Sequence, residues 1–219
     1  MSKFYQSVTA DIVIFTIEND ELKVLLIKRV KKPFKNQWAL PGGFLLENEP
    51  PEKAALRVLR DKAGMGNMYM EQLYTFPGSG RDPRGNVITV TYFALAPINK
   101  MLAKPNKGQN PTLHLLKKLP ELAFDHEKII DYALKRLRSK LEYTNAIYSL
   151  LPKYFTFNHL QKTYELIFGR KLDKRNFRKK FMMLGLIKST KKLHKGIRQR
   201  PAQLYQFTSR KPTELKKFF

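Results

Sequence analysis

The chain has 219 residues, of which 42% are hydrophobic and 12% aromatic, so it can form one large core or two smaller ones, and we expect two domains. It has no cysteine, which excludes disulfides, thiolate zinc sites and cysteine nucleophiles, and its four histidines show no metal-ligand spacing. With 42 Lys and Arg against 18 Asp and Glu, the formal net charge is +24, which favours nucleic acid as a partner.

The positive charge is concentrated in the C-terminal third. Residues 144–219 contain 19 basic and 3 acidic residues, whereas residues 1–143 contain 23 and 15. The C-terminal third is therefore expected to face a polyanion. No apolar run approaches the roughly 18 residues of a membrane span, and Asp11 interrupts any signal sequence, so we expect a soluble cytoplasmic protein with no membrane partner.

The first half alternates strand and helix signals. In chain order the pattern predicts strands at residues 8–17 and 22–30, a helix at 51–63, and strands at 70–76 and 87–95. Pro50 and Pro51 mark the start of the helix, and Gly64 marks its end. The glycine-rich stretch "PGSGRDPRGN" predicts a turn between the last two strands, and the basic residues 99–112 predict an exposed loop.

A long helix closes the first domain. It is predicted over residues 124–143, with Asp125 as N-cap. Its apolar stripe consists of Ile130, Ala133, Leu134, Leu137 and Leu141. We place the boundary just beyond it, which gives domains at residues 1–143 and 144–210 and a basic tail at 211–219.

The second domain has the pattern of a winged helix-turn-helix. A short helical segment ends at Pro152, Thr156 caps the helix "FNHLQKTYELIFG", Asp173 caps the basic helix "DKRNFRKKFMMLG" and Gly185 ends it. Two strands then flank a loop that carries Lys191, Lys192, Lys195, Arg198 and Arg200. The DNA-binding candidates are Lys174, Arg175, Asn176, Arg178, Lys179, Lys195, Arg198 and Arg200. Asn176 and Arg178 are expected to read base edges, and the lysines to hold phosphates.

The stretch "GGFLLENEPPEKAALRVLRDKAGM" has the spacing G-x5-E-x7-R-x-U-x4-G-U, where U is apolar. This spacing, preceded by "WALPGGF", resembles the Nudix box, whose catalytic members carry three glutamates that bind Mg²⁺. The corresponding positions here are Val58, Asp61 and Lys62. Because residues i, i+3 and i+4 share one helix face, three carboxylates there would converge on the metal, but this chain offers one and adds an ammonium. We expect no metal site, no Mg²⁺ cofactor and no catalytic residues.

A phosphorylated ligand remains compatible with this frame. Lys62 can supply counter-charge to a diphosphate, and glycines allow backbone N–H groups to approach its oxygens. The candidate ligand residues are Arg29, Gly42, Gly43, Phe44, Arg57, Lys62, Arg81 and Arg84. The plain alternative is that Arg57, Asp61 and Lys62 are surface helix charges, with Arg57 and Asp61 paired at i, i+4. In the same way "GSGRDPRG" can be a turn, since Pro83 breaks any dinucleotide fingerprint.

Over nearly its whole length the chain resembles the NrtR family of Nudix-related transcriptional regulators. The resemblance rests on "WALPGGF", "MEQLYTF", "GRDPRG", "LAFDH", "GRKLDKRNFRKK" and "RPAQLYQF". It implies an α/β (α+β) Nudix fold, with a mixed sheet between helices, followed by a winged helix. It also implies a homodimer and ADP-ribose or a related NAD-derived nucleotide as effector. The winged helices are expected to bind a palindromic operator upstream of NAD-metabolism genes, and effector binding is expected to release them from it.

Three alternatives stay open. An active Nudix hydrolase of the ADP-ribose pyrophosphatase type could be tethered to nucleic acid and draw its carboxylates from Asp61, Glu47, Glu49 and Glu52. A regulator of the same architecture could respond to a sugar. A nucleic-acid-binding module could use the first domain merely as a dimerisation scaffold.

Overall fold

The computed structural model of the chain describes residues 7–66, 68–100, 110–194 and 201–215. It divides into two compact units. The N-terminal unit comprises the described residues up to Glu18 and from Leu22 to Leu134, and the C-terminal unit comprises Asn19–Glu21 and the described residues from Lys135 onward. The division falls within the long helix, which the sequence assigns wholly to the first domain. Of the helices in these ranges, none combines the length and apolarity needed to cross a membrane.

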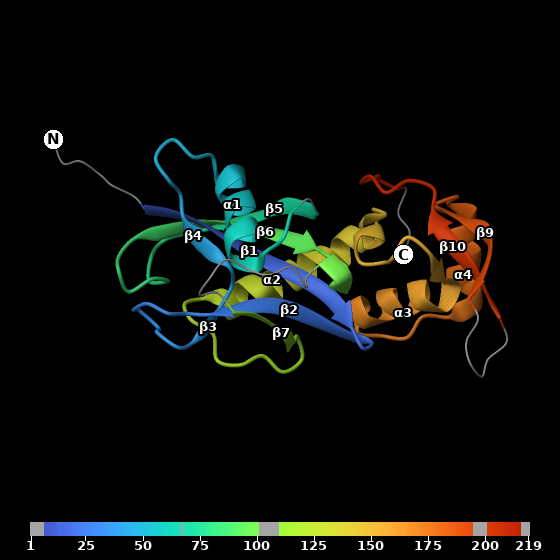
Figure 1. The fold of residues 1–219 in the computed structure, drawn as a ribbon, viewed down its shortest axis with the longest axis horizontal. Coiled ribbons are helices and arrows are strands. Elements are labelled where there is room, and N and C mark those ends of the chain that lie inside the picture. Colours follow the sequence, from blue (N-terminus) through green and yellow to red (C-terminus); the bar gives the residue numbers. More distant parts are fainter. Residues whose placement is uncertain (1–6, 67, 101–109, 195–200, 216–219) are drawn as a thin grey trace. The chain divides into compact units, whose positions relative to one another are not determined.

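The N-terminal unit is built on one mixed sheet (Figure 1). Its seven described strands are β1 (Ser7–Glu18), β2 (Glu21–Lys28), β3 (Trp38–Ala39), β4 (Gly42–Phe44), β5 (Tyr69–Phe76), β6 (Val87–Leu95) and β7 (Pro111–Leu115). The order is β3-β2-β1-β6-β5, with β4 also pairing with β1 and β7 with β2. The β1–β6 pair is parallel, whereas β4, β3, β7 and β5 pair antiparallel with their partners. The mixed sheet expected of a Nudix fold is confirmed.

Strand β1 lies in the middle of the sheet and is covered on both faces. Every residue from Thr9 to Thr16 is buried, which explains why the strand reads as a nearly continuous β-branched and apolar run. Its even-numbered residues Ala10, Ile12 and Ile14 belong to the same core cluster as the buried face of α1 (Pro51–Ala63). This packing fixes α1 across the strand that carries Thr9 and Asp11.

Helix α1 has the predicted bounds. Pro51 occupies its first turn, and Gly64, with φ of 65°, adopts the left-handed conformation that ends it. The helix buries Ala54, Ala55, Val58, Leu59 and Ala63. Val58 belongs to this apolar face, so its side chain packs in the hydrophobic core.

The sequence pattern missed the short strands of the N-terminal unit. Strands β3 and β4 are two and three residues long, and they exist because the neighbouring long strands offer free backbone groups, as where Gly42 pairs with Asp11. The predicted loop 99–112 is partly wrong, because β7 begins at Pro111 and the short 3₁₀ helix η1 covers Ile98–Lys100. Residues 101–109 lie outside the described residues.

The long helix is α2 (His126–Leu141). Its predicted stripe is buried at Ile130, Ala133, Leu137 and Leu141, each no more than 1% exposed, and Leu134 is half-buried. Asp125 immediately precedes the helix as predicted, but its carboxylate accepts hydrogen bonds from Arg81. The sequence-predicted cap is therefore used to hold an arginine.

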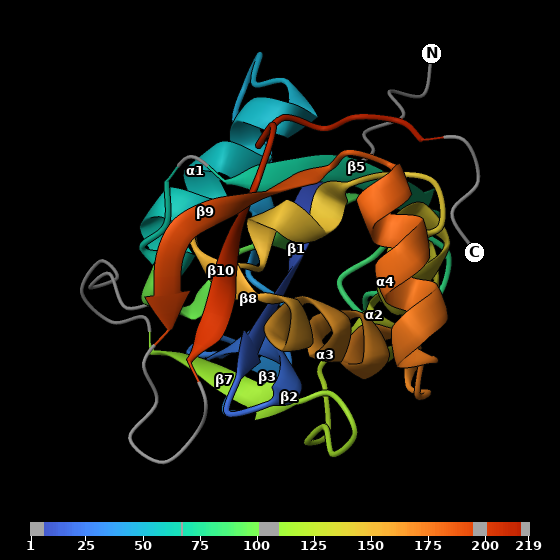
Figure 2. The same cartoon turned by 90° about the vertical axis from the view of Figure 1, so that its right-hand side faces the viewer.

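The C-terminal unit has the order of a winged helix. Its elements are η2 (Ala146–Ser149), β8 (Phe155–Thr156), α3 (Phe157–Phe168), α4 (Lys174–Met183), β9 (Ile187–His194) and β10 (Ala202–Phe207). The strands form an antiparallel sheet in the order β8-β10-β9 (Figure 2). Thr156 and Asp173 cap α3 and α4 as predicted, each accepting a backbone N–H three residues on.

Aromatic side chains fill the core of this unit. Tyr164, Phe177 and Phe181 are buried, and their rings lie 5.3 to 5.9 Å apart. Part of the predicted basic tail also belongs to the unit, because Asn145 exchanges hydrogen bonds with the backbone of Lys211 and Thr213. The described part of the tail is therefore attached to the fold.

Candidate functional site

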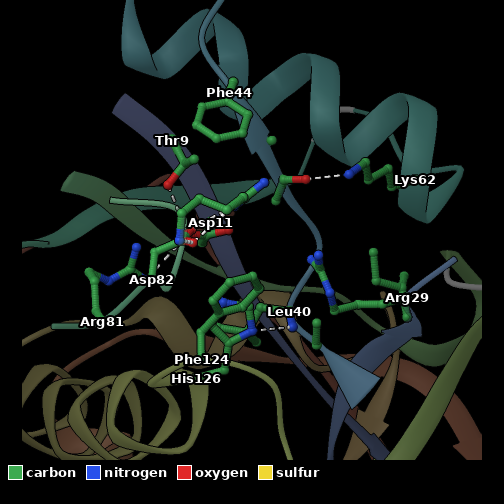
Figure 3. Close-up of a pocket in the computed structure, with 15 residues that line it drawn as sticks. Thr9, Asp11, Arg29, Leu40, Phe44, Lys62, Arg81, Asp82, Phe124 and His126 are labelled. Atoms are coloured by element: carbon green, nitrogen blue, oxygen red, sulfur yellow. Dashed lines mark hydrogen bonds and ion pairs between the residues drawn. The ribbon is translucent and has the colours of Figure 1, made fainter. Parts of the chain in front are cut away.

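A cavity of about 140 Å³ opens in the N-terminal unit beside β1, β4 and α1 (Figure 3). The predicted ligand residues that line it are Arg29, Gly42, Gly43, Phe44, Lys62, Arg81 and Arg84. We call this cavity the central pocket; its other lining residues include Thr9, Asp11, Asp82, Phe124 and His126. These side chains come from segments distant in sequence, so tertiary packing alone brings them together.

Asp11 forms the buried floor of the central pocket. The residue is 6% exposed, and its carboxylate accepts hydrogen bonds from Thr9 at 3.2 Å and Thr89 at 2.6 Å. Opposite it on β4 stands Gly42, where an added Cβ would lie 1.6 Å from Oδ1 of Asp11. Only glycine fits this position, because any side chain would collide with the carboxylate.

Three cations converge on the pocket. Lys62 reaches from α1 and donates a hydrogen bond from Nζ to the carbonyl of Gly42 (Figure 3). Burial lowers the pKa of Lys62, and the charge of Arg29 lowers it further against the opposing attraction of Asp11. Burial also lowers the pKa of Arg29, and the nearby charge of Arg84 adds to this. With Arg81, four cations line the pocket against the two carboxylates of Asp11 and Asp82, and this surplus of positive charge favours the binding of an anion.

Arg84 is held by an acid and lies against two aromatic rings. Its guanidinium pairs with Asp82 through contacts of 2.6 to 3.2 Å. Burial acts to raise the pKa of Asp82, but hydrogen bonds from Arg84 outweigh it and hold that pKa below its ordinary value. The guanidinium carbon lies 4.9 Å from the ring centre of Phe44 and 5.6 Å from that of Phe124.

Phe124 adopts a conformation that costs free energy. Its φ of 59° places a non-glycine residue in the left-handed region, and its ring meets Phe34 edge-to-face at 4.9 Å and Arg29 at 4.6 Å. Such strain persists where the surrounding contacts enforce it, and it occurs often at ligand sites. The ring is therefore fixed as a wall of the pocket.

Arg81 is engaged in the interior. Its side chain is 5% exposed and donates to both carboxylate oxygens of Asp125, at 2.7 and 3.2 Å, while Asp11 lies 3.9 Å away. This network ties the β5–β6 turn to the start of α2 beneath the pocket. Arg81 thus holds the segments that form the pocket in place, whereas Arg29, Lys62 and Arg84 line the pocket where a ligand can reach them.

The structure does not bring Arg57 into the central pocket. Its guanidinium pairs with Glu49 at 2.7 and 2.8 Å and donates to the carbonyl of Phe44 at 2.9 Å. The hydrogen bonds that Glu49 accepts from Arg57, and one from the backbone N–H of Leu46, lower the pKa of Glu49 to about 2. The alternative pairing of Arg57 with Asp61 is also wrong, because Asp61 pairs with Arg60 at 3.3 Å.

The residues at the box positions do not fit a magnesium site. Val58 is 1% exposed and lies in the apolar core. Lys62 places an ammonium against the Gly42 carbonyl, and Asp61 points to Arg60. Within the described ranges, no group of three or more His, Asp or Glu side chains could hold a metal ion. A divalent cation would meet an ammonium where it needs oxygen ligands.

Sequence reasoning missed several pocket residues. Asp11 carries a signal, since a charged residue within a buried apolar strand is uncommon without a specific partner. His126 is 3% exposed and its Nδ1 accepts the N–H of Leu40 at 2.9 Å; burial lowers its pKa, so the ring is neutral. Phe124 and Asp82 gave no local signal, because their roles depend on where the turns bring them.

The described candidates for DNA contact lie on α4. Lys174, Arg175, Asn176, Arg178 and Lys179 are exposed, and Phe177 between them is buried. Arg178 donates to the hydroxyl of Tyr205 at 2.8 Å, and its guanidinium carbon lies 4.8 Å from the ring centre of Phe157. The charges therefore stand on the outer face of the helix, with Arg178 held against the sheet.

The loop between the last two strands, the wing of the winged helix, was predicted to carry five basic residues, and the structure describes two of them. Lys191 and Lys192 are exposed within β9, so their prediction as loop residues is wrong. Lys195, Arg198 and Arg200 lie outside the described residues. Ala202 pairs with His194 next to the connection between the strands, so both lysines lie toward the loop end of the β9–β10 hairpin.

Comparison with known proteins gives consistent matches for both units. The model of the NUDIX domain matches residues 8–133, and that of the NrtR DNA-binding winged helix domain matches residues 147–207. An ADPR responsive transcriptional repressor of Acinetobacter baylyi is 39% identical over 91% of this chain and 81% of its own length. An ADP-ribose pyrophosphatase of Methanocaldococcus jannaschii is 42% identical over 53% of this chain and 68% of its own length.

Solved structures agree with these matches. NrtR of Shewanella oneidensis in complex with a 27mer DNA superposes with a TM-score of 0.82 at 34% identity, covering 92% of this chain and 93% of that one. The NUDIX domain of the same protein with ADP ribose superposes with a TM-score of 0.53 at 36% identity, covering 62% of this chain and 90% of that one.

Proposed function

Because this chain belongs to the NrtR family, in which a Nudix domain precedes a DNA-binding winged helix, we propose that it is a transcriptional repressor that responds to ADP-ribose. The winged helix binds the operator, and the central pocket binds the effector. Occupation of the pocket releases the DNA. As a DNA-binding regulator, the protein acts in the cytoplasm.

The convergence of Arg29, Lys62 and Arg84 on one pocket supports this function most directly. Together with Arg81 they line the pocket as four cations against the two carboxylates of Asp11 and Asp82, so its lining carries excess positive charge. A diphosphate offsets that charge, and an arginine fork suits its oxygens. Phe44, which is 41% exposed beside Arg84, offers an apolar surface for a base or sugar.

The pocket binds the nucleotide without cleaving it. Hydrolysis in the Nudix fold depends on magnesium, and Val58 and Lys62 leave one carboxylate of the expected three on that helix face. Lys62 supplies a fixed positive charge at the Gly42 carbonyl instead. Such a charge stabilises a bound diphosphate but generates no nucleophile, because it has no coordinated water to deprotonate.

The DNA-binding half acts as a homodimer on a palindromic operator. Helix α4 presents Lys174, Arg175, Asn176 and Lys179 on its exposed face, as a recognition helix in the major groove does. The lysines hold phosphates and Asn176 reads a base edge. We expect the operator upstream of NAD-metabolism genes, as the resemblance to the family implies.

A gel shift with the chain's own upstream region tests the proposal. The wild type should bind this DNA, and ADP-ribose should release it. Arg84→Ala should bind the DNA equally well but need a much higher ADP-ribose concentration for release, because the variant changes the pocket and leaves α4 intact. DNA affinity that stays constant over a wide ADP-ribose range would disprove effector control.

The relationship to the Methanocaldococcus jannaschii pyrophosphatase supports a second candidate, a working ADP-ribose hydrolase. In that case magnesium-dependent turnover should be measurable with ADP-ribose and should disappear in Asp61→Ala. The repressor proposal predicts no turnover in either protein and the same ADP-ribose affinity with magnesium or with EDTA. Turnover by the wild type that EDTA abolishes would favour the hydrolase.

A further inference from the structure

A second cavity, of about 340 Å³, adjoins the central pocket. It is lined by six cationic side chains, Lys28, Arg29, Lys31, Lys32, Lys62 and Arg84, together with Ile27 and Val30. We call it the basic subsite. Its lining differs from that of the central pocket, where Asp11 and Asp82 face the cations, because the described lining residues of the basic subsite include no carboxylate.

The two cavities share a wall. Ile27, Arg29, Lys62 and Arg84 line both of them. At about 140 Å³ the central pocket is smaller than typical small-molecule sites, which measure roughly 300–1,000 Å³, so a nucleoside diphosphate sugar has to extend beyond it. A further cavity beside the β5–β6 turn shares only Asp82 with the central pocket, so the basic subsite is the more continuous extension.

The charges of the basic subsite are poorly compensated. Within the part of the chain that the structure describes, no carboxylate pairs with Lys28, Lys31 or Lys32. Arg29 donates a hydrogen bond from Nε to the carbonyl of Pro33 at 2.9 Å and pairs with no acid there. Burial, and after it repulsion from Arg84, lowers the pKa of Arg29. Neutral sugar hydroxyls do not compensate such a set of charges, whereas a phosphate group with several anionic oxygens does.

We propose that the basic subsite binds a phosphomonoester that the effector carries in addition to its diphosphate, so that the preferred ligand is a phosphorylated nucleoside diphosphate sugar. This inference rests on the proposed function, because it extends the same ligand out of the central pocket. The additional phosphate can stand on the ribose of the nucleoside or on the terminal sugar. Both sources have the same chemistry at the subsite, and they differ in the direction from which the ligand enters it.

Calorimetry on the full-length protein distinguishes the two positions of the additional phosphate. The ligands are ADP-ribose, ADP-ribose 2′-phosphate and ADP-ribose 1″-phosphate, which place the extra phosphate at opposite ends. One of the two phosphorylated ligands should bind at least about tenfold more tightly than ADP-ribose, because charge-assisted hydrogen bonds to the phosphate are added. The phosphorylated ligand that binds more tightly shows whether the additional phosphate belongs on the nucleoside ribose or on the terminal sugar.

Variants test whether the lysines of the basic subsite cause the tighter binding of the phosphorylated ligand. Lys31→Ala combined with Lys32→Ala should remove the preference for the phosphorylated ligand, because it should weaken that ligand clearly more than it weakens ADP-ribose. Lys35→Ala, an exposed lysine of the same segment that does not line the subsite, should keep the full preference.

Two results would overturn the inference while leaving the proposed function intact. Either all three ligands bind equally, or the double variant weakens ADP-ribose as much as it weakens the phosphorylated ligands, which would assign the lysines to the diphosphate. If none of the three ligands binds the wild type, the proposed function and the inference both fail.

Discussion

Lys62 shows how one residue changes what the central pocket can hold. Its ammonium is half-buried on α1 and bonded to the Gly42 carbonyl, beside the buried carboxylate of Asp11. A carboxylate at this position could share a metal ion with a phosphate, whereas the ammonium meets the phosphate directly. The identity of residue 62 therefore separates metal-dependent chemistry from metal-free recognition.

The lowered pKa of Lys62 predicts a pH dependence of effector binding. As the pH rises through that pKa, below the ordinary lysine value of about 10.4, the ammonium is lost and ADP-ribose affinity should fall by about tenfold. Lys62→Arg should keep its affinity over the same range, because guanidinium stays charged. Calorimetry between neutral and alkaline pH checks this, and parallel profiles for the two proteins would contradict it.

The charge of Lys62 affects folding stability in the opposite direction from effector binding. A lysine with a depressed pKa binds its proton less well in the folded state, so it costs stability below that pKa. The cost fades as the pH rises through the lowered pKa toward the ordinary lysine value. Lys62 therefore lowers stability over the same pH range in which its charge favours an anionic ligand.

Arg81 is predicted to matter for stability. Its side chain is 5% exposed and pairs with Asp125, so Arg81→Ala leaves Asp11 and Asp125 without their cation. We expect a loss of about 3 kcal/mol in the free energy of unfolding, measured by urea denaturation. Arg60→Ala removes an exposed pair on α1 and should cost less than about 1 kcal/mol. Equal losses would show that the Arg81 network is not a structural anchor.

Among the elements, the loop before α1 is held by an ion pair. Arg57 on the helix binds both carboxylate oxygens of Glu49, which in turn accepts the N–H of Leu46. The same arginine donates to the carbonyl of Phe44, which lines the central pocket. Thus Arg57, although outside the pocket, fixes the segment that carries the Phe44 ring.

This ion pair predicts a stability difference that depends on pH. The folded-state pKa of Glu49 is about 2, lowered by Arg57, so the pair contributes stability above the ordinary glutamate pKa and loses it as the pH falls through about 2. Glu49→Gln should therefore be less stable than the wild type at pH 7, and the two should converge toward pH 2. Glu47→Gln, at an exposed position of the same loop, is the matched control. A gap that stays constant with pH would disprove the assignment.

Helix α4 combines two kinds of basic residue. Lys174 is exposed in its first turn, whereas Arg178 is held by the hydroxyl of Tyr205 and by the Phe157 ring. Lys174→Ala should weaken DNA binding for all sequences and lower the salt slope by about one unit. Tyr205→Phe removes the hydrogen bond that holds Arg178 and should relax specificity at one base position without changing the salt slope. Binding titrations at several salt concentrations on the operator and on single-base variants measure both, and a reversed outcome would exchange the two roles.

At the scale of the whole molecule, one chain carries a unit with the central pocket and a winged-helix unit. Helix α2 runs continuously from the first into the second, since the division falls between Leu134 and Lys135. A continuous helix offers a covalent route by which events in one unit can reach the other. The proposed release of DNA by an effector therefore requires both units in one chain.

Dimer symmetry predicts the layout of the operator. If two copies place their α4 helices in successive major grooves on one side of the duplex, the half-sites lie about 10 base pairs apart, or at a multiple of that spacing. Footprinting of the bound upstream region measures this spacing. Protection of a single half-site, or a spacing that changes between operators by half a turn, would contradict a symmetric dimer.

Local patterns predicted the long elements and the helix ends. The bounds of α1 follow from Pro51 and Gly64, and the caps of α3 and α4 follow from Thr156 and Asp173, because each of these signals acts within one helical turn. The short strands β3, β4 and β7 were missed because pairing with β1 and β2 makes them strands, whatever their own propensity.

By itself the sequence determined the spacing that resembles the Nudix box, the basic winged helix and the candidate cations Arg29, Lys62 and Arg84. Tertiary structure alone decided which charges face a ligand: it turned Arg57 toward Glu49 and Arg81 toward Asp125, and brought Asp11, Asp82 and Phe124 to the central pocket. The reason is that composition and spacing fix charge and periodicity along the chain, whereas partners and burial depend on distances between segments far apart in it.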